Sequence, residues 1–167
     1  MAEPLRSRRV FDGTVLKVDL EAWGHGYDHE VVHHPGAAAV LPIRPDGHVL
    51  LVKQLRPAIR DMLTEIPAGL LDVKGEDALT CAARELREET GYVHESIEFL
   101  GGYYASAGFS DEYVHLFWAN TRPEPQAPPE DTLELISMPL DRMTTAARTG
   151  KIRDVKTALA LLMYAAH

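Results

Sequence analysis

The hydrophobic and polar positions along the chain first predict a strand-rich N-terminal half. Residues 9–23 and 29–34 have strand-like patterns, and residues 37–56 contain two apolar runs separated by the Pro-Asp-Gly segment at 45–47. These three residue types favour a tight turn, because proline fixes φ, glycine accepts positive φ and aspartate bonds to its own backbone. Residues 37–56 are therefore predicted to form a β-hairpin.

A helix is predicted after this hairpin. Residues 65–76 are rich in glycine and proline and predict a loop, whereas residues 77–90 have helical periodicity that ends at Gly91. Turning the helix by 100° per residue brings its apolar side chains onto one face: Leu79, Ala82, Ala83 and Leu86. This face is expected to pack on a sheet.

The rest of the chain mixes strands and helices. Three further segments have strand-like patterns: residues 97–106, 112–120 and 133–138. Residues 121–132 contain four prolines and predict a loop, and helices are predicted at about 140–149 and 154–166. Together these elements predict an α+β sandwich around a mixed sheet, in a single domain that covers residues 1–167.

Composition and charge restrict the partners. The chain has 167 residues, of which 46% are hydrophobic and 25% charged, and this composition is typical of one globular domain. Its formal net charge of -8 argues against a nucleic acid or an anionic membrane as the main partner, since both usually bind a basic surface. An acidic protein that binds phosphates is expected to use metal ions.

The chain is expected to be cytoplasmic. Its single cysteine, Cys81, cannot form an internal disulfide, and the first residues lack the apolar run of a signal peptide. The longest apolar segment, residues 158–166, is about half of the roughly 20 residues that span a bilayer. Cys81 is expected to be a buried packing residue, and the eight histidines form no metal-ligand pattern.

Three like charges gather on the helix predicted over residues 77–90. Glu85, Glu88 and Glu89 fall on one side of it, with Arg84 four residues before Glu88. Each like-charge pair at this spacing costs about 0.2 to 0.5 kcal/mol in an isolated helix. One interpretation is a solvated acidic face. The other is a metal site, because the preceding loop can add backbone carbonyls to the carboxylates and Mg²⁺ prefers oxygen ligands.

This segment resembles the Nudix box, G-x5-E-x7-R-E-U-x-E-E-x-G-U, in which U is an apolar residue. The matching positions are Glu76, Arg84, Glu85, Leu86, Glu88, Glu89, Gly91 and Tyr92. Two features depart from the box: Gly69 precedes Glu76 by six intervening residues instead of five, and the final position is a tyrosine. An extra residue in a loop costs little and leaves the helix unchanged.

Beyond the box, the chain is similar to the ADP-ribose pyrophosphatase branch of the Nudix hydrolases. The similar segments are QLRPAIRDMLTEIPAGLLD and SAGFSDEYVHLF, and the resemblance covers nearly all of residues 9–165. It implies a Nudix-type α/β/α sandwich with a mixed central sheet and a catalytic loop-helix-loop. The implied reaction splits ADP-ribose, or a related nucleoside diphosphate sugar, into AMP or another nucleoside monophosphate and a sugar phosphate. Ala107 replaces a proline that is usual in this branch, which leaves the preferred sugar open.

The resemblance also implies a Mg²⁺ site, with Mn²⁺ as an alternative ion. The implied ligands are Glu85, Glu88, Glu89 and the backbone carbonyl of Ala68. The implied structural positions are Gly69, Glu76, Arg84 and Gly91, with Glu76 and Arg84 bracing the loop against the helix. Such ions join the pyrophosphate to the carboxylates and help to deprotonate an attacking water.

A general base is expected in the loop over residues 128–134. Glu130 is the first candidate, Asp131 and Glu134 follow, and Glu85 is a further candidate because some family members use that position. The alternative interpretation is an acidic loop that is only solvated.

Four substrate contacts are implied: Arg56 with a phosphate, Glu65 near the terminal ribose, Glu112 near substrate or metal, and Phe109 stacked on adenine. Tyr103 and Tyr104 are further stacking candidates. The alternatives are a surface ion pair for Arg56 and core packing for the aromatic residues.

The resemblance further implies a homodimer that exchanges its N-terminal strands, residues 9–35. Two other functions stay open: a nucleotide-pool sanitising or dinucleotide polyphosphate hydrolase, and a nucleotide-sugar sensor without turnover. Sensors of this kind usually lose carboxylates of the box, and all are present in this chain.

Overall fold

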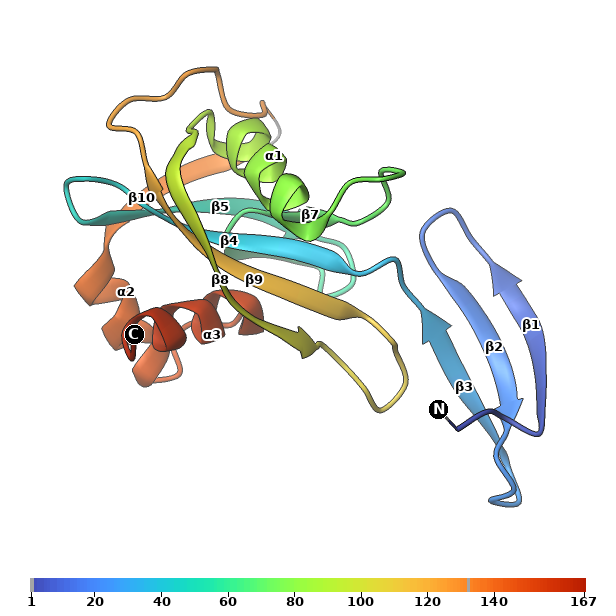
Figure 1. The fold of residues 1–167 in the computed structure, drawn as a ribbon. Helices are drawn as coiled ribbons and strands as arrows, with labels where there is room; N and C mark the ends of the chain where they lie inside the picture. The colour runs from blue at the N-terminus through green and yellow to red at the C-terminus, as the bar shows by residue number, and fades with distance from the viewer. Residues whose placement is uncertain (1, 132) are drawn as a thin grey trace.

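The structure is a computed structural model that describes residues 2–131 and 133–167. Helices and strands follow each other in these residues as shown in Figure 1. Their bounds are β1 (Arg6–Asp12), β2 (Lys17–Ala22), β3 (Asp28–His33), β4 (Ala37–Ile43), β5 (His48–Arg56), β6 (Asp61–Glu65), β7 (Ala68–Leu70), α1 (Ala78–Thr90), β8 (His94–Tyr104), β9 (Tyr113–Thr121), β10 (Glu134–Pro139), α2 (Leu140–Arg148) and α3 (Val155–Tyr164).

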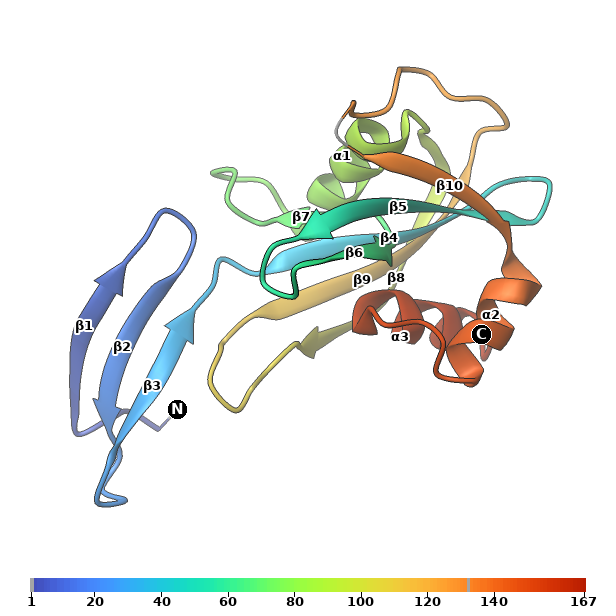
Figure 2. The same cartoon turned by 180° about the vertical axis from the view of Figure 1, so that it is seen from behind.

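The main sheet is mixed and lies between two helical layers. Its strands follow the order β10-β5-β4-β9-β8, with β6 paired to β5 and β7 paired to β4. β4 and β9 are parallel, whereas β4 and β5 form the antiparallel hairpin predicted around the Pro-Asp-Gly turn. Helix α1 covers one face, and α2 and α3 cover the other (Figures 1 and 2). The predicted α/β/α sandwich is therefore confirmed.

Strand β4 supplies side chains to both layers. All seven of its residues are buried, and alternate residues point to opposite faces. Ala38 and Val40 pack with the α1 side chains Ala82 and Leu86, whereas Ala39 and Leu41 belong to the core under α2 and α3. Two hydrophobic cores therefore share one central strand, and this strand fixes where α1 lies.

The strands β1, β2 and β3 form a separate sheet beside the main body (Figures 1 and 2). Backbone hydrogen bonds join β3 to the loop between β8 and β9: the Val32 amide donates to the Phe109 carbonyl at 2.7 Å, and the Asp111 amide donates to the Val32 carbonyl at 3.1 Å. This N-terminal sheet exposes apolar side chains, among them Leu5, Val10 and Phe11.

Two expectations about the elements need correction. The predicted loop over residues 65–76 contains the short strand β7, and β6 precedes it. Pairing with β4 and β5 makes these residues extended, and strands of three to five residues carry almost no periodic signal. Leu79 is 44% exposed although it was expected on the packed face. It points in nearly the same direction as Leu86, so its position in the first turn of α1 accounts for its exposure.

Cys81 is buried, as predicted, and burial raises the pKa of its thiol to about 11. Within the described ranges, 2–131 and 133–167, every helix is too short or too polar to cross a lipid bilayer.

Candidate active site

Helix α1 begins and ends at residues that set the position of its acidic side chains. The Thr80 amide donates to Asp77 Oδ1 at 2.8 Å, and this hydrogen bond caps the first turn. The helix ends at Gly91, whose φ of 76° is left-handed and whose amide donates to the Arg87 carbonyl at 2.9 Å. The helix predicted over 77–90 is therefore confirmed with nearly the same bounds.

The acidic residues of α1 meet the loop around β7. The Ala68 amide donates to Glu89 Oε2 at 3.2 Å, and Glu89 is only 7% exposed. Glu85 lies against Gly69, where an added Cβ would come within 1.9 Å of Glu85 Oε1. Glycine is therefore required at position 69, because a side chain would displace the carboxylate. The structure thus brings the Ala68–Gly69 peptide and two of the predicted metal ligands together.

Burial gives these carboxylates an unusual proton affinity. Burial raises the pKa of Glu89 to about 8, and the charges of Glu85 and Glu130 add to this effect, while the Ala68 amide and Arg56 oppose it. Burial also raises the pKa of Glu85 against the opposing influence of Arg84. Like charges and desolvation both disfavour the ionised forms, so the site has an excess of negative charge that a bound cation would offset.

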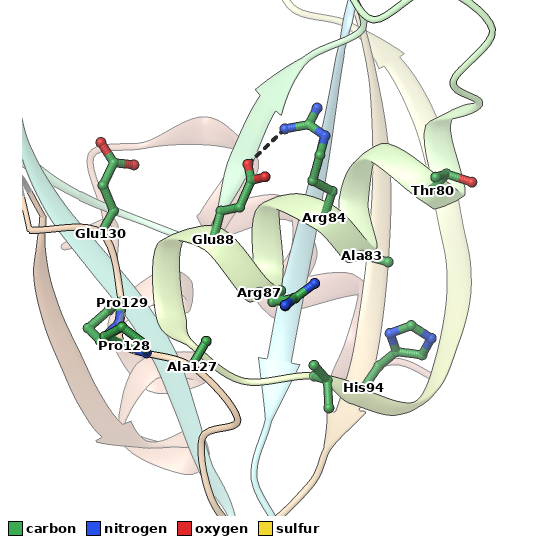
Figure 3. Close-up of a pocket in the computed structure, with 11 residues that line it drawn as sticks. Thr80, Ala83, Arg84, Arg87, Glu88, His94, Ala127, Pro128, Pro129 and Glu130 are labelled. Atoms are coloured by element: carbon green, nitrogen blue, oxygen red, sulfur yellow. Dashed lines mark hydrogen bonds and ion pairs between the residues drawn. The ribbon is translucent and has the colours of Figure 1, made fainter.

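The Arg84 guanidinium ties the helix to the preceding loop. Its Nε and Nη2 atoms donate to the two oxygens of Glu76 at 2.8 and 2.9 Å. Its Nη1 atom donates to Glu88 Oε2 at 3.0 Å, the contact drawn in Figure 3, and also to Glu85. A two-pronged arginine–carboxylate contact fixes both partners in orientation. The predicted bracing contact is therefore present, and Arg84 serves Glu85 as well as Glu88.

The loop after β9 places Glu130 at the C-terminal end of α1. The Gln126 amide donates to the Gly91 carbonyl at 2.7 Å, and the Glu130 amide donates to the Glu88 carbonyl at 3.0 Å. An added Cβ at Gly91 would lie 2.1 Å from the Ala127 carbonyl oxygen, so this glycine also permits the loop to approach the helix. The charge of Glu130 adds to the raised pKa of Glu89.

The other candidates for the general base lie in different surroundings. Glu134 is part of β10 and pairs with Lys53 at 3.3 Å on the neighbouring strand β5. Asp131 is exposed, and residue 132 of the predicted loop lies outside the described residues. Figure 3 shows Glu130 and Glu88 lining one pocket beside α1, a cavity of about 880 Å³. The geometry therefore favours Glu130 within this loop.

A second cavity, of about 600 Å³, joins the loop around β7 to three of the four predicted substrate residues. Arg56, Glu65 and Glu112 line it together with Ala68 and Gly69. Arg56 Nε donates to Glu65 Oε2 at 2.7 Å, so the ion pair considered for Arg56 exists within the cavity itself. The Glu65 side chain is 2% exposed and that of Arg56 is 39% exposed, which leaves the guanidinium accessible to a ligand.

Phe109 lies elsewhere. It is 57% exposed and lines a different cavity, of about 400 Å³, which Trp23, His29 and Tyr104 also line. Core packing is therefore excluded for Phe109 and Tyr104, and Tyr103 is 38% exposed. The structure does not bring Phe109 into the cavity that contains Arg56.

Two charged residues of the second cavity were missed from the sequence. Lys156 Nζ donates to Glu65 Oε1 at 3.1 Å, and to Asp154 Oδ1 at 2.7 Å. Both residues lie at the start of the apolar helix α3. In the sequence, two charged residues at the start of an apolar helix were the feature that could have pointed to them. The contact of Lys156 with Glu65 spans 91 positions of sequence and leaves no local pattern.

His33 is a strand residue, as expected, and it lies beside two acidic side chains of the N-terminal sheet. Ligand atoms of Asp19, Glu21 and His33 lie within 4.8 Å of one another. Asp19 also pairs with Arg9, and His33 Nδ1 lies 2.8 Å from Asp111 Oδ2. The cluster therefore joins the N-terminal sheet to the loop before β9 by ion pairs.

Comparisons with known proteins agree with this geometry. The family model of the NUDIX domain matches residues 32–159. The methanol dehydrogenase activator of Bacillus methanolicus is 35% identical over 165 residues, which cover 94% of this chain and 89% of that protein. The ADP-ribose pyrophosphatase of Bacillus subtilis (strain 168) is 35% identical over 163 residues, which cover 95% of this chain and 87% of that protein.

A solved structure supports the fold independently. The crystal structure of an ADP compounds hydrolase superposes with a TM-score of 0.79 at 19% identity, and the match covers 98% of this chain and 92% of that one. The sequence matches and the superposition agree with the acidic helix and the loop described above. The chain therefore belongs to the Nudix family.

Proposed function

We propose that this protein hydrolyses the pyrophosphate bond of ADP-ribose or a related nucleoside diphosphate sugar, in a reaction that depends on Mg²⁺. The products are AMP, or another nucleoside monophosphate, and a sugar phosphate. The observation that carries this proposal is that the half-buried Glu85 and the buried Glu89 lie beside the Ala68–Gly69 peptide, next to a cavity that presents Arg56. The similarity to an ADP-ribose pyrophosphatase supports the same substrate class.

The residues present fit a hard divalent cation. Glu85, Glu88, Glu89 and the Ala68 carbonyl offer oxygen donors, which Mg²⁺ and Mn²⁺ accept. Burial, with a smaller contribution from neighbouring acids, raises the pKa values of Glu85 and Glu89, and a bound cation would favour their ionised forms. When bound, such ions neutralise charge on the pyrophosphate and acidify an attacking water.

We assign the other roles as follows. Glu130 accepts the proton of the attacking water, because the loop holds it beside Glu88 and Glu89. Arg56 binds a phosphate through its guanidinium, and Glu65 and Glu112 face the same ligand from the cavity wall. Phe109 lines the cavity beside the N-terminal sheet and not the one that Arg56 lines, so we assign it no contact with this ligand.

We further propose that the protein is a homodimer in the cytoplasm. The N-terminal sheet stands apart from the main body and exposes Val10 and Phe11, so exchange or pairing with a second subunit would bury these side chains. The lone buried thiol of Cys81 suits a reducing compartment.

A substrate panel tests the proposed reaction. The full chain with Mg²⁺ is incubated with ADP-ribose, GDP-mannose, a diadenosine polyphosphate and 8-oxo-dGTP, and the products are separated by chromatography. We expect AMP and ribose 5-phosphate from ADP-ribose, and no turnover after chelation of the metal. Preferred hydrolysis of 8-oxo-dGTP or the diadenosine polyphosphate would support a sanitising or dinucleotide hydrolase instead. Binding of ADP-ribose without hydrolysis would support a sensor.

A further inference from the structure

The first turn of α3 contains a cluster of buried charges that the proposed mechanism does not use. Asp154 is 5% exposed, and its Oδ2 atom accepts hydrogen bonds from the Thr157 amide at 2.9 Å and the Thr157 hydroxyl at 2.6 Å. Lys156 donates to the remaining Asp154 oxygen at 2.7 Å. Both oxygens of this buried carboxylate are therefore satisfied within one helical turn.

The same turn also contacts the residues that lie just before β7. Lys156 Nζ donates to Glu65 Oε1 at 3.1 Å, and the Ile66 amide donates to Thr157 Oγ1 at 2.8 Å. These contacts fix two consecutive residues that lie just before Ala68. The start of α3 thus supports the strand end from which the loop departs.

Glu65 is shared between two cations. Arg56 Nε binds Oε2, and Lys156 binds Oε1. Among the described residues, Glu65 is the one hydrogen-bond partner of the Arg56 guanidinium, so its two terminal nitrogens are available to a ligand in the 600 Å³ cavity. Arginine tends to bind a carboxylate through two parallel hydrogen bonds when both oxygens are accessible. Lys156 instead draws Oε1, the oxygen that this second contact would use, toward its own ammonium at 3.1 Å.

We propose that Lys156 is a positioning residue, which holds the Glu65 carboxylate so that the Arg56 guanidinium stays directed at a phosphate of the nucleoside diphosphate. This inference rests on the proposed function for the identity of the ligand. Without the lysine ammonium, Glu65 binds Arg56 through both oxygens. A terminal nitrogen of Arg56 then donates to Glu65 and no longer to the phosphate. The unpaired Asp154 carboxylate also adds negative charge to the cavity wall that an anionic ligand must approach.

The test compares three substitutions in the full chain. K156M keeps the length of the side chain and removes its charge, K156R keeps the charge, and R153Q is the control because Arg153 forms an exposed pair with Asp61. With ADP-ribose and saturating Mg²⁺, we expect K156M to raise KM about 10-fold and to leave kcat within about threefold, because binding in the ground state is lost. K156R should recover most of the change, and R153Q should match the wild type.

A binding measurement separates this inference from the proposed reaction. Titration calorimetry with ADP in the absence of metal should show about 10-fold weaker binding to K156M than to the wild type. This result supports the inference even if the wild type hydrolyses none of the panel, which would refute the proposed function only. The inference is overturned if K156M binds ADP as tightly as the wild type does, or if the wild type does not bind ADP. It is also overturned if K156R loses as much ADP binding as K156M.

A double variant covers the case in which K156M does not fold. D154N/K156M removes both charges of the buried pair, and asparagine still caps α3. We expect the same rise in KM and the same loss of ADP binding, with folding checked by circular dichroism. Wild-type values of both constants in the folded double variant contradict the inference.

Discussion

Glu89 combines two properties that carboxylates seldom combine, since it is 7% exposed and has like charges beside it. Among the described residues, the Ala68 amide at 3.2 Å and the charge of Arg56 oppose the rise in the pKa of Glu89. A cation is therefore the natural partner of this side chain.

The first prediction concerns the substitution Glu89→Gln. The amide retains the size and the contact with the loop but removes the charge, so we expect kcat/KM to fall about 100-fold or more. The measurement is ADP-ribose hydrolysis across a Mg²⁺ titration, with folding followed by circular dichroism. Glu95→Gln removes an exposed charge of β8 and is the control. Near-normal turnover in the Glu89 variant would refute its role as a metal ligand.

Contacts between distant residues mark the limit of what the sequence predicted. The box acids, Gly69 and the Glu76–Arg84 pair lie within one continuous segment, and the resemblance of that segment to the Nudix box implied that they meet. Lys156 and Glu65 are 91 positions apart, and His33 and Asp111 are 78 apart. Helical and strand periods carry information over only a few turns or residues, and such contacts depend on how the sheet is assembled.

Among the larger elements, α1 and the loop after β9 depend on the same residue, Gly91. It ends the helix, and it lets the loop pack against the helix end. The chain offers a matched pair of glycines that end helices in the left-handed region, Gly91 with φ of 76° and Gly150 with φ of 70°. An added Cβ at Gly91 would meet the Ala127 carbonyl oxygen, whereas one at Gly150 would meet nothing within 4 Å.

We therefore predict different outcomes for Gly91→Ala and Gly150→Ala. Both substitutions should lower the free energy of unfolding by roughly 1 to 2 kcal/mol, because alanine is strained in this backbone conformation. Only Gly91→Ala should also displace the loop that holds Glu130, and we expect its kcat to fall at least about 10-fold. Urea unfolding measures the first effect and steady-state kinetics the second. Equal activity of the two variants would show that Glu130 needs no such support.

The junction between β3 and the loop before β9 is predicted to depend on pH. The hydrogen bond to Asp111 raises the pKa of His33 above its ordinary 6.5, burial opposes this, and Asp19 adds to it. Arg9 and Glu21 lie in the same cluster. A raised pKa means that the folded form binds the proton more tightly, so the stabilisation is complete below pH 6.5 and is lost as the pH rises through the raised value.

Hydrogen exchange measures this effect. After correction for the intrinsic rate, amides of residues 29–33 and 109–111 should exchange faster at pH 9 than at pH 6. His33→Gln should abolish the difference. A pH dependence that persists in this variant would assign the effect to another group.

The short strands show why element prediction was incomplete. The helix over 77–90 has a cap at each end and a full apolar face, so its bounds were nearly correct. β6 and β7 have five and three residues, and pairing with β5 and β4 alone makes them strands. Local propensity is too weak to indicate such segments, because tertiary pairing decides them.

In the whole molecule, the N-terminal sheet and the main body differ in how well they are covered. The main sheet has helices on both faces, whereas β1 is exposed along its whole length. A sheet of three strands with an exposed apolar surface is expected to find a partner.

We predict that Phe11→Glu converts a dimer into a monomer. Phe11 is 55% exposed, and a charge at this position would be buried without a partner in a dimer that covers the sheet. Light scattering at micromolar concentration measures the mass, and Val73→Glu, at a 50% exposed residue of the main body, is the control. A wild-type protein that is monomeric under these conditions would contradict the exchange of strands.

The shared strand β4 has a consequence for how the main body unfolds. Alternate side chains of one strand belong to both hydrophobic cores, so neither helical layer can separate without exposing the strand that the other layer needs. Melting of α2 and α3 should therefore coincide with melting of α1, as one cooperative transition in calorimetry. The thermal stability of α1 therefore depends on packing on the opposite face of the sheet.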